Sequence, residues 1–363
     1  MSKVFFLPID KALMDGEFAK LLNKAADMKG IRPTDTVAVK IHPGEEGNTS
    51  YVSPDNVNRV IDALDPGTNR IFLTDTTVLY PGRRMSAPDY LRLTNEHGFG
   101  LPYTAPFIIA DGLRGEDETV VKTPEDFHTD EAYIASIISS SDALVVISHF
   151  KGHLLTGFGG ALKNLGMGCA SRAGKLYQHS SVNPLIKTDK CNACGICAAY
   201  CREKAISIGT YAKINPDICT GCGECLGRCP EGAIRVSWNQ NMNVFVRRMV
   251  EYAWAAVKVS RPLVYVNFLT SIVPDCDCMH DSDPPFVDDI GILASTDPVA
   301  IDMASLDLVT AAPASENSPV RAGAGEDKFT ACRPDICGIL QLSIAESIGL
   351  GSMEYNLVKI VDA

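Results

Sequence analysis

Eight cysteines between Cys191 and Cys229 constrain this chain more than any other feature. They form two C-x2-C-x2-C-x3-C runs, from Cys191 to Cys201 and from Cys219 to Cys229, whose first cysteines lie 28 residues apart. The runs also align as an internal repeat, KCNACGICAAYCREKAI over ICTGCGECLGRCPEGAI. A duplicated and regular spacing of thiols predicts metal chemistry at this segment rather than disulfide bonds.

This spacing is typical of bacterial two-cluster ferredoxins, in which the fourth cysteine of each run ligates the other cluster. We therefore expect two [4Fe–4S] clusters, held by Cys191, Cys194, Cys197 and Cys229 and by Cys219, Cys222, Cys225 and Cys201. A pair of zinc sites is the alternative, because C-x2-C pairs also bind zinc. Zinc would leave the duplicated third and fourth cysteines of each run unexplained.

The composition limits the cellular compartment and the kinds of binding partner that we expect for this protein. Thirteen cysteines without a secretion signal predict a reducing, cytoplasmic location, and the expected clusters predict an anaerobic setting. The net charge of −11 argues against nucleic acid as a partner. Apolar runs stay shorter than the roughly 18 residues that span a bilayer, so we expect no membrane contact. The expected partners are a redox protein and a small-molecule substrate.

Short apolar runs alternate with helical patterns on both sides of the cysteines, which is typical of an α/β fold with a mostly parallel sheet and helices on both faces. We expect residues 1–186 and 238–363 to form one discontinuous α/β body. Residues 187–237 would then be an inserted, small α+β ferredoxin-like module. Within the body, the pattern of residues 131–139 (EAYIASIIS) predicts a helix.

The segment 149–180 directly follows a predicted buried strand and contains seven glycines. In open α/β sheets, ligands bind just beyond the carboxyl ends of strands, and glycines let the backbone approach them closely. The candidate catalytic side chains of this segment are His149, His153, Lys163 and His179. Other predicted strand ends carry similar polar loops, which hold His42, Glu45, Asp75, Tyr80 and Arg84. The alternative is an ordinary glycine-rich connection with surface lysines.

The triplet Cys276-Asp277-Cys278 follows another predicted strand. Two thiols separated by one residue point the same way from an extended backbone. They form a candidate extra metal site, completed by Cys169 or a histidine, or a pair that cycles between dithiol and disulfide. The alternative is two inert thiols in a loop.

Four segments carry a resemblance to a known family: VKIHPGEEGNTSY, DTTVLYPGRR, GHLLTGFGGALKNLGMGC and PDCDCMH with DIGILASTDPVAIDMA. Over nearly its whole length the chain resembles the family labelled domain of unknown function 362, many members of which carry an inserted ferredoxin module. The resemblance implies an iron–sulfur protein with a conventional α/β body. The short G-G-x-x-K-N stretch is also similar to lactate racemase-type proteins, which use a nickel cofactor.

Three hypotheses for the function follow. In the first, an iron–sulfur oxidoreductase moves single electrons through both clusters to or from a pocket in the α/β body. In the second, the protein is a non-catalytic electron carrier that docks onto a partner enzyme. In the third, a metal-dependent enzyme uses its clusters for structure alone. The chain has no G-x-G-x-x-G fingerprint for a dinucleotide.

Overall fold

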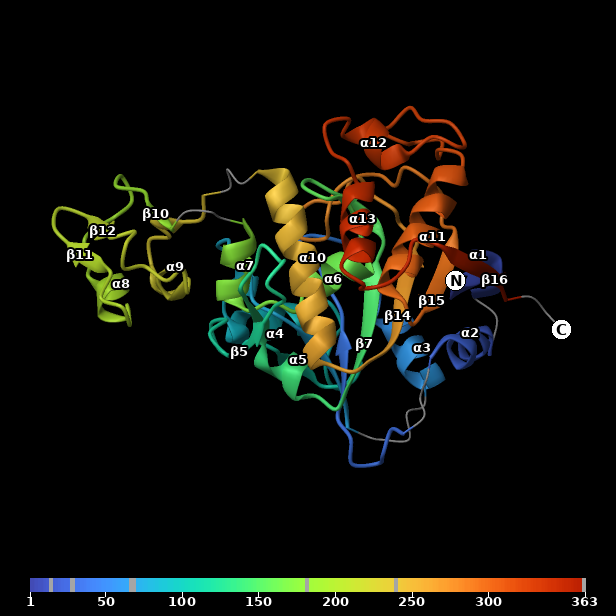
Figure 1. Cartoon of the computed structure of the whole chain (residues 1–363), viewed down its shortest axis with the longest axis horizontal. Coiled ribbons are helices and arrows are strands. Elements are labelled where there is room, and N and C mark those ends of the chain that lie inside the picture. The colour runs from blue at the N-terminus through green and yellow to red at the C-terminus, as the bar shows by residue number, and fades with distance from the viewer. Residues whose placement is uncertain (13–15, 27–29, 65–69, 180–182, 238–240, 361–363) are drawn as a thin grey trace.

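The computed structural model describes residues 1–12, 16–26, 30–64, 70–179, 183–237 and 241–360. An eight-stranded sheet crosses the larger part of the molecule in the order β16-β1-β15-β14-β7-β2-β3-β4 (Figure 1). Five of its seven pairings are parallel, and β15 alone runs against the others. The strands are β1 (Ser2–Pro8), β2 (Val37–Lys40), β3 (Ile71–Asp75), β4 (Phe107–Ile109), β7 (Ala143–His149), β14 (Pro262–Leu269), β15 (Gly291–Ser295) and β16 (Tyr355–Lys359).

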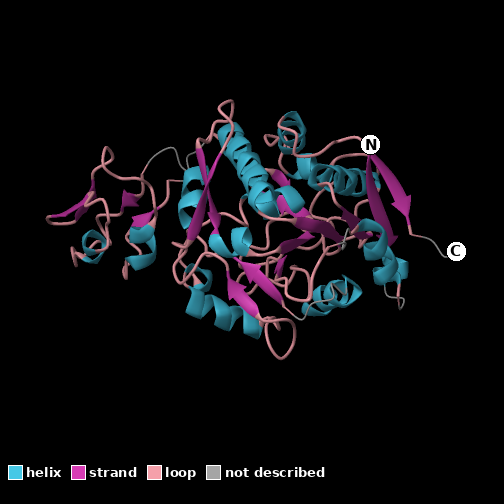
Figure 2. Cartoon of the chain, turned by 60° about the horizontal axis from the view of Figure 1, so that its bottom comes forward, coloured by secondary structure: helices cyan, strands magenta, loops and turns pink. Residues whose placement is uncertain are grey.

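Helices cover both faces of this sheet (Figure 2). Successive side chains of a strand point to opposite faces, and β7 shows this directly. Its Leu144 and Val146 pack into the core beneath α6 (Ala161–Gly166), α10 (Met242–Val259), α11 (Pro298–Ala311) and α13 (Ile339–Ser347). Its Val145 and Ile147 pack on the opposite side, with α2 (Glu17–Ala25) and α3 (Pro54–Leu64). The predicted α/β class with a mostly parallel sheet and two helical faces is confirmed.

The remaining elements lie outside the eight-stranded sheet. The helices are α1 (Ile9–Ala12), η1 (Arg83–Met85), α4 (Ala87–Glu96), α5 (Ser136–Ser140), α7 (Arg172–His179), α8 (Ile196–Ala199), α9 (Glu224–Arg228) and α12 (Lys328–Cys332). The strands are β5 (Glu118–Lys122), β6 (Glu131–Ala135), β8 (Lys151–His153), β9 (Gly157–Gly159), β10 (Leu185–Ile186), β11 (Ile206–Ile208), β12 (Ala212–Ile214) and β13 (Ile234–Arg235). None of the helices in the described ranges is long and apolar enough to cross a bilayer.

The helix predicted over residues 131–139 is wrong in its first half. Residues Glu131–Ala135 form β6, which pairs antiparallel with β5, and only Ser136–Ser140 are helical. Ala132 and Ile134 are fully buried, whereas Glu131 is exposed and Tyr133 half-buried, which is the two-residue alternation of a strand. Pairing with β5 therefore overrides the local helical pattern.

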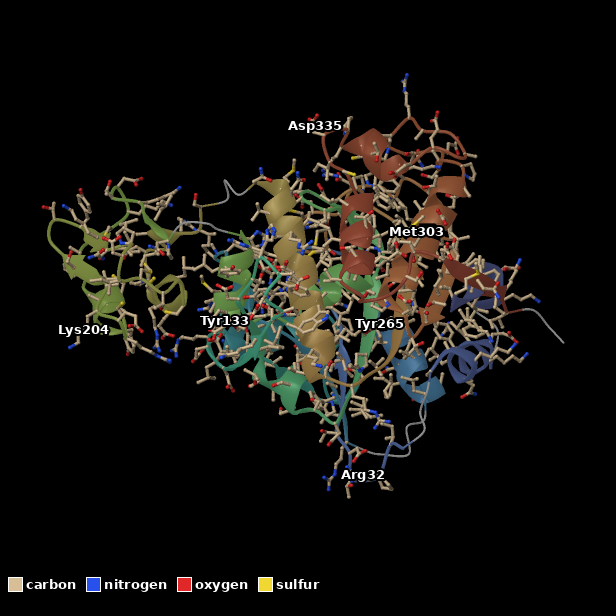
Figure 3. The ribbon with its side chains drawn as sticks, viewed as in Figure 1. Arg32, Tyr133, Lys204, Tyr265, Met303 and Asp335 are labelled. Atoms are coloured by element: carbon tan, nitrogen blue, oxygen red, sulfur yellow. The ribbon has the colours of Figure 1, made fainter. Side chains whose placement is uncertain are left out.

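The cysteine lobe, residues 183–237, projects from one side of the body (Figure 1, left). Strands on both sides of it in sequence, β7 before and β14 after, pair directly in the central sheet. Figure 3 shows Lys204 at the outer end of the lobe and Tyr265 inside the body. Leu226 and Cys225 of the lobe join one apolar cluster with Leu79 and Leu176 of the body. The lobe is thus anchored on the body through apolar contacts at α9 and α7.

Candidate functional site

A cavity of about 780 Å³, here called the body cavity, opens where β2, β3 and β7 end. The carboxyl ends of parallel strands meet at one edge of a sheet, so loops from distant parts of the chain converge there. Lys40 and Asp75 close β2 and β3, His149 closes β7, and Cys278 comes from the loop that follows β14. The cavity walls also include residues of α6 and α7.

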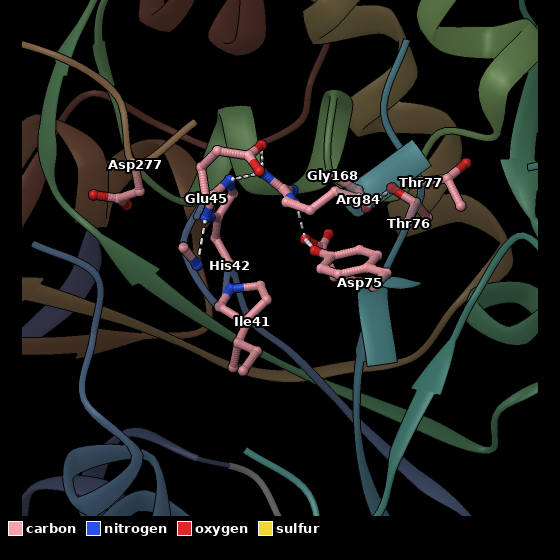
Figure 4. A network of polar contacts seen from close by, with 12 residues as sticks. Ile41, His42, Glu45, Asp75, Thr76, Thr77, Arg84, Gly168 and Asp277 are labelled. Atoms are coloured by element: carbon pink, nitrogen blue, oxygen red, sulfur yellow. Dashed lines mark hydrogen bonds and ion pairs between the residues drawn. The ribbon is translucent and has the colours of Figure 1, made fainter. Parts of the chain in front are cut away.

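A buried ion network forms one wall. Asp75 lies 2.8 Å from Lys40 Nζ and 3.1 Å from Arg84 Nη2, and all three side chains are nearly inaccessible to water. Burial alone would raise the pKa of Asp75, but Lys40 and Arg84 outweigh it and hold that pKa below its ordinary value. Arg84 also faces His42 Nε2 at 3.0 Å and Glu45 Oε2 at 3.7 Å (Figure 4). This wall is preorganised and keeps its charges paired.

Asp277, the middle residue of the cysteine triplet, anchors a second wall. Its carboxylate lies 2.8 Å from His149 Nδ1 and 3.2 Å from Lys151 Nζ, and it accepts a hydrogen bond from Ser50 at 3.0 Å. Burial acts to raise the pKa of Asp277, but His149 and Lys151 bring it well below its ordinary value. The other ring nitrogen of His149 faces the Thr270 carbonyl oxygen at 2.9 Å. His149 is therefore fixed between an acid and the backbone, which suits it to positioning rather than to free proton exchange.

The two thiols of the triplet differ sharply. A hydrogen bond from Cys278 lowers the pKa of Cys276 well below its ordinary value, and Lys163 and Lys151 reinforce this against the effect of burial. Lys163 Nζ lies 3.2 Å from Cys276 Sγ. The same hydrogen bond, together with burial, raises the pKa of Cys278 well above its ordinary value. Cys276 is therefore the more acidic thiol of the pair, with the Lys163 ammonium group beside it.

Four basic side chains, His153, Lys163, Lys175 and His179, line the end of the body cavity beside α6 and α7. Burial, and then the charge of Lys163, lowers the pKa of both histidines, to about 3 for His179. His153 Nδ1 accepts a hydrogen bond from the Thr156 backbone N–H at 3.2 Å and lies 2.8 Å from the Thr156 hydroxyl oxygen. Both imidazoles are therefore neutral at physiological pH.

The structure places the four predicted catalytic residues His149, His153, Lys163 and His179 around the body cavity. Cys278 also lines it, and Cys276, which is outside the lining, has its sulfur 3.2 Å from Lys163 Nζ. Cys169 is different, because its fully buried thiol points to the Asn164 carbonyl oxygen at 3.8 Å and lies outside the lining. Among the described residues, no three His, Cys, Asp or Glu side chains converge as a single metal ion requires. The three cysteines of the predicted extra site are thus not gathered around one metal position.

Sequence reasoning missed two important residues, Lys40 and Asp277. Lys40 ends an apolar strand run and Asp277 was treated as a spacer between two cysteines. A lysine at the end of a buried strand is a usable signal, because lysine is almost never fully buried unless it is paired. For Asp277 the local sequence carries no signal, since its partners lie more than 100 residues away.

The eight cysteines of the lobe line two separate small cavities. One is lined by Cys191, Cys194, Cys197 and Cys229, and the other by Cys201, Cys219, Cys222 and Cys225. Each cavity therefore takes three cysteines from one run and the fourth from the other. Backbone N–H groups point at several of these sulfurs: Ala205 to Cys201 at 3.2 Å, Ala212 to Cys191 at 3.4 Å and Ala233 to Cys229 at 3.2 Å.

Fold and site together define an α/β protein with a polar cavity at the strand ends and a cysteine-rich lobe beside it. The chain belongs to the family described as domain of unknown function (DUF362), whose model matches residues 37–307. No curated protein matches the sequence.

Two solved structures are similar at low identity. One is the lactate racemase apoprotein from Thermoanaerobacterium thermosaccharolyticum, with 12% identity, a TM-score of 0.42 and coverage of 87% of this chain and 59% of that one. The other is a structural-genomics protein from Thermotoga maritima, with 11% identity, a TM-score of 0.35 and coverage of 91% and 57%. The chain thus spans less than two thirds of the length of either protein.

Proposed function

We propose that the protein is an iron–sulfur oxidoreductase whose lobe holds two [4Fe–4S] clusters and whose body cavity binds a small substrate. The observation that carries the proposal is the sorting of the eight cysteines into two cavities, each built from both runs. When bound, such clusters accept and donate single electrons, at potentials set by hydrogen bonds and solvent access.

The residues around the two lobe cavities fit [4Fe–4S] clusters. Four thiols surround each cavity, and the backbone N–H groups directed at Cys191, Cys201 and Cys229 stabilise negative charge on sulfur. A cubane separates its ligand sulfurs more widely than a single zinc ion does. Within the described ranges the cysteines line cavities and do not converge on one point, which favours the larger group.

The second cysteine set is the one next to the body. Gly223 and Gly227, on either side of Cys225, lie against the side chain of Arg172 in α7, and Leu79 of the adjoining apolar cluster also lines the body cavity. This contact is the route that we propose for electrons between the lobe and the cavity. At the outer side, Cys194 is exposed, which suits approach by a low-potential redox partner protein.

Within the cavity, we assign Cys276 and Cys278 to a redox pair rather than to a metal site. The ammonium group of Lys163, 3.2 Å from Cys276 Sγ, stabilises a thiolate and repels a metal cation. A disulfide between the two cysteines takes up two electrons and two protons to give two thiols. Cys276 then releases its proton and remains a thiolate beside the Cys278 thiol.

Metal analysis and electron paramagnetic resonance of the anaerobically purified protein test the proposal. We expect about eight irons and eight sulfides per chain, the content of two cubanes. Cys201→Ala should damage the cluster of Cys219, Cys222 and Cys225 and spare the other. Cys332→Ala, outside both sets, is the matched control and should keep all the iron. Stoichiometric zinc with little iron would refute the proposal.

The electron-carrier alternative is favoured by the exposure of Cys194 and Cys222. A carrier needs exposed clusters and has no use for a buried thiolate–thiol pair. The double variant Cys276→Ser, Cys278→Ser separates the two functions. In the oxidoreductase it keeps both cluster signals and loses a two-electron thiol–disulfide couple. If every redox feature persists in that variant, the carrier function is the better assignment. Either function fits a reducing, cytoplasmic compartment, since all thirteen cysteines lie in described residues and are free.

A further inference from the structure

Charge is unevenly compensated around the body cavity. Lys40 and Arg84 are paired with Asp75, and Lys151 is paired with Asp277. The end of the cavity beside α6 and α7 differs, because its four side chains Lys163, Lys175, His153 and His179 are all basic.

Neither lysine at this end forms an ion pair with a carboxylate in the described part of the chain. Lys163 donates to the sulfur of Cys276 at 3.2 Å, so its charge is partly compensated by that thiol, and Lys175 is the lysine without an acidic hydrogen-bond partner. Lys175, which is nearly inaccessible to water, donates to the Thr76 hydroxyl and the Thr77 carbonyl oxygen. A buried ammonium group that has only neutral oxygens as partners is held at a cost in free energy. That cost is recovered when an anion enters the cavity.

We propose that this end of the body cavity binds the anionic group of a small acid, a carboxylate or a phosphate, through Lys163, Lys175, His153 and His179. The inference rests on the proposed function only in treating the cavity as the substrate site. Ammonium groups bind such anions through short, charge-assisted hydrogen bonds. The remaining volume extends towards Cys278, so an acid held by its anionic group would present its other end to the thiol pair.

The histidines add a proton linkage to this site. Their pKa values are lowered by burial and by Lys163, and that of His179 also by Lys175. An anion placed among these groups opposes the lysine charges and raises both pKa values. Binding is therefore expected to take up protons and to strengthen as the pH falls.

Lys175 sets the alkaline limit of binding. Burial lowers its pKa to about 8, while Asp111 and Asp75 act to raise it and Lys40 and Arg84 to lower it. A group with this pKa loses its charge as the pH rises through about 8, and a bound anion raises the pKa. Affinity for an anion should accordingly decline above that pH.

Isothermal titration calorimetry on the full chain, kept anaerobic, tests the proposal with defined probes. Inorganic phosphate and succinate form the two anionic arms, and succinamide is the uncharged analogue of succinate. We expect at least one anion to bind and succinamide to bind at least about 10-fold more weakly, which corresponds to one charge-assisted contact. The arm that binds more tightly identifies phosphate or carboxylate as the ligand group.

Variants locate the site. Lys175→Met should weaken the preferred anion at least about 10-fold, and Lys175→Arg should restore part of the affinity. Lys163→Met tests the same site with a half-buried residue, should Lys175→Met fail to fold. Lys122→Met, at an exposed position of β5, is the control and should leave affinity unchanged. Succinamide binding as tightly as the preferred anion, or anion affinity untouched by both methionine variants, would overturn the inference. Because the assay needs no electron transfer, loss of the clusters does not affect its outcome.

Discussion

Replacing Asp75 by Asn removes the negative charge that holds Lys40 and Arg84 together beneath the body cavity. Asp75 is buried, and its carboxylate lies 2.8 Å from Lys40 and 3.1 Å from Arg84. Removing one partner of a buried ion pair costs about 3–5 kcal/mol, because the remaining charges stay buried without compensation. Arg84 keeps Glu45 at 3.7 Å, whereas Lys40 keeps only neutral oxygens.

The expected shift in melting temperature follows from the chain length. A chain of 363 residues has an unfolding entropy of about 0.8 kcal/mol per kelvin, so the variant should melt about 4–6 °C below the wild type. Calorimetry measures the melting temperature, and denaturant titration measures the free energy of unfolding. Asp89→Asn is the matched control, because its partner Arg92 lies at 3.0 Å in an exposed ion pair. The melting temperature of Asp89→Asn should equal that of the wild type.

The pH dependence supplies an independent check. The folded pKa of Asp75 lies below its unfolded value, so its contribution is complete above the unfolded pKa near 4. That contribution is lost as the pH falls through the folded pKa, and only the wild type should show this loss. A variant that melts like the wild type at neutral pH would refute the assigned role of Asp75.

Two further changes test the lobe and the thiol pair. In Gly227→Ala the new Cβ would lie 1.9 Å from Arg172 Nη1, so the buried Arg172 side chain must shift from its place between α9 and the body. Overpacking of this kind costs about 1–3 kcal/mol, to be measured by thermal unfolding. Gly209→Ala, whose Cβ meets nothing closer than 4.0 Å, should behave as the wild type, and equal stability of the two variants would contradict this docking. For Cys276, alkylation by iodoacetamide near pH 7 should be faster than that of an ordinary thiol with the same exposure. Lys163→Met raises the pKa of Cys276 and should slow the reaction, and an unchanged pH profile would exclude the thiolate.

The sequence predicted the fold class and the edge of the sheet that carries the cavity, but not its charge pairing. Apolar runs ending in polar loops locate strand ends, and parallel topology brings those ends together, which explains why His149 and His179 lie around one cavity. The pairing of Asp277 with His149 and Lys151 depends on side-chain positions that only the folded chain defines. Cys169 shows the opposite error, because its position within the glycine-rich segment did not place its thiol on the cavity wall. The sequence also does not show which basic residues of the glycine-rich segment matter most, because burial decides the charge state of Lys175 and His179.

Helix α7 contributes side chains both to the body cavity and to the contact with the cysteine lobe. Lys175 and His179 face the body cavity, while Leu176, one position away from Lys175, packs in the apolar cluster that anchors the lobe. A chimera that receives the lobe of a relative must therefore receive a compatible α7 as well, and changing α7 alters the cavity. Under the proposed function, this stretch of eight residues would connect electron entry through the lobe with substrate binding in the cavity. Exchanging the lobe and α7 together should therefore disturb the protein less than exchanging either one alone.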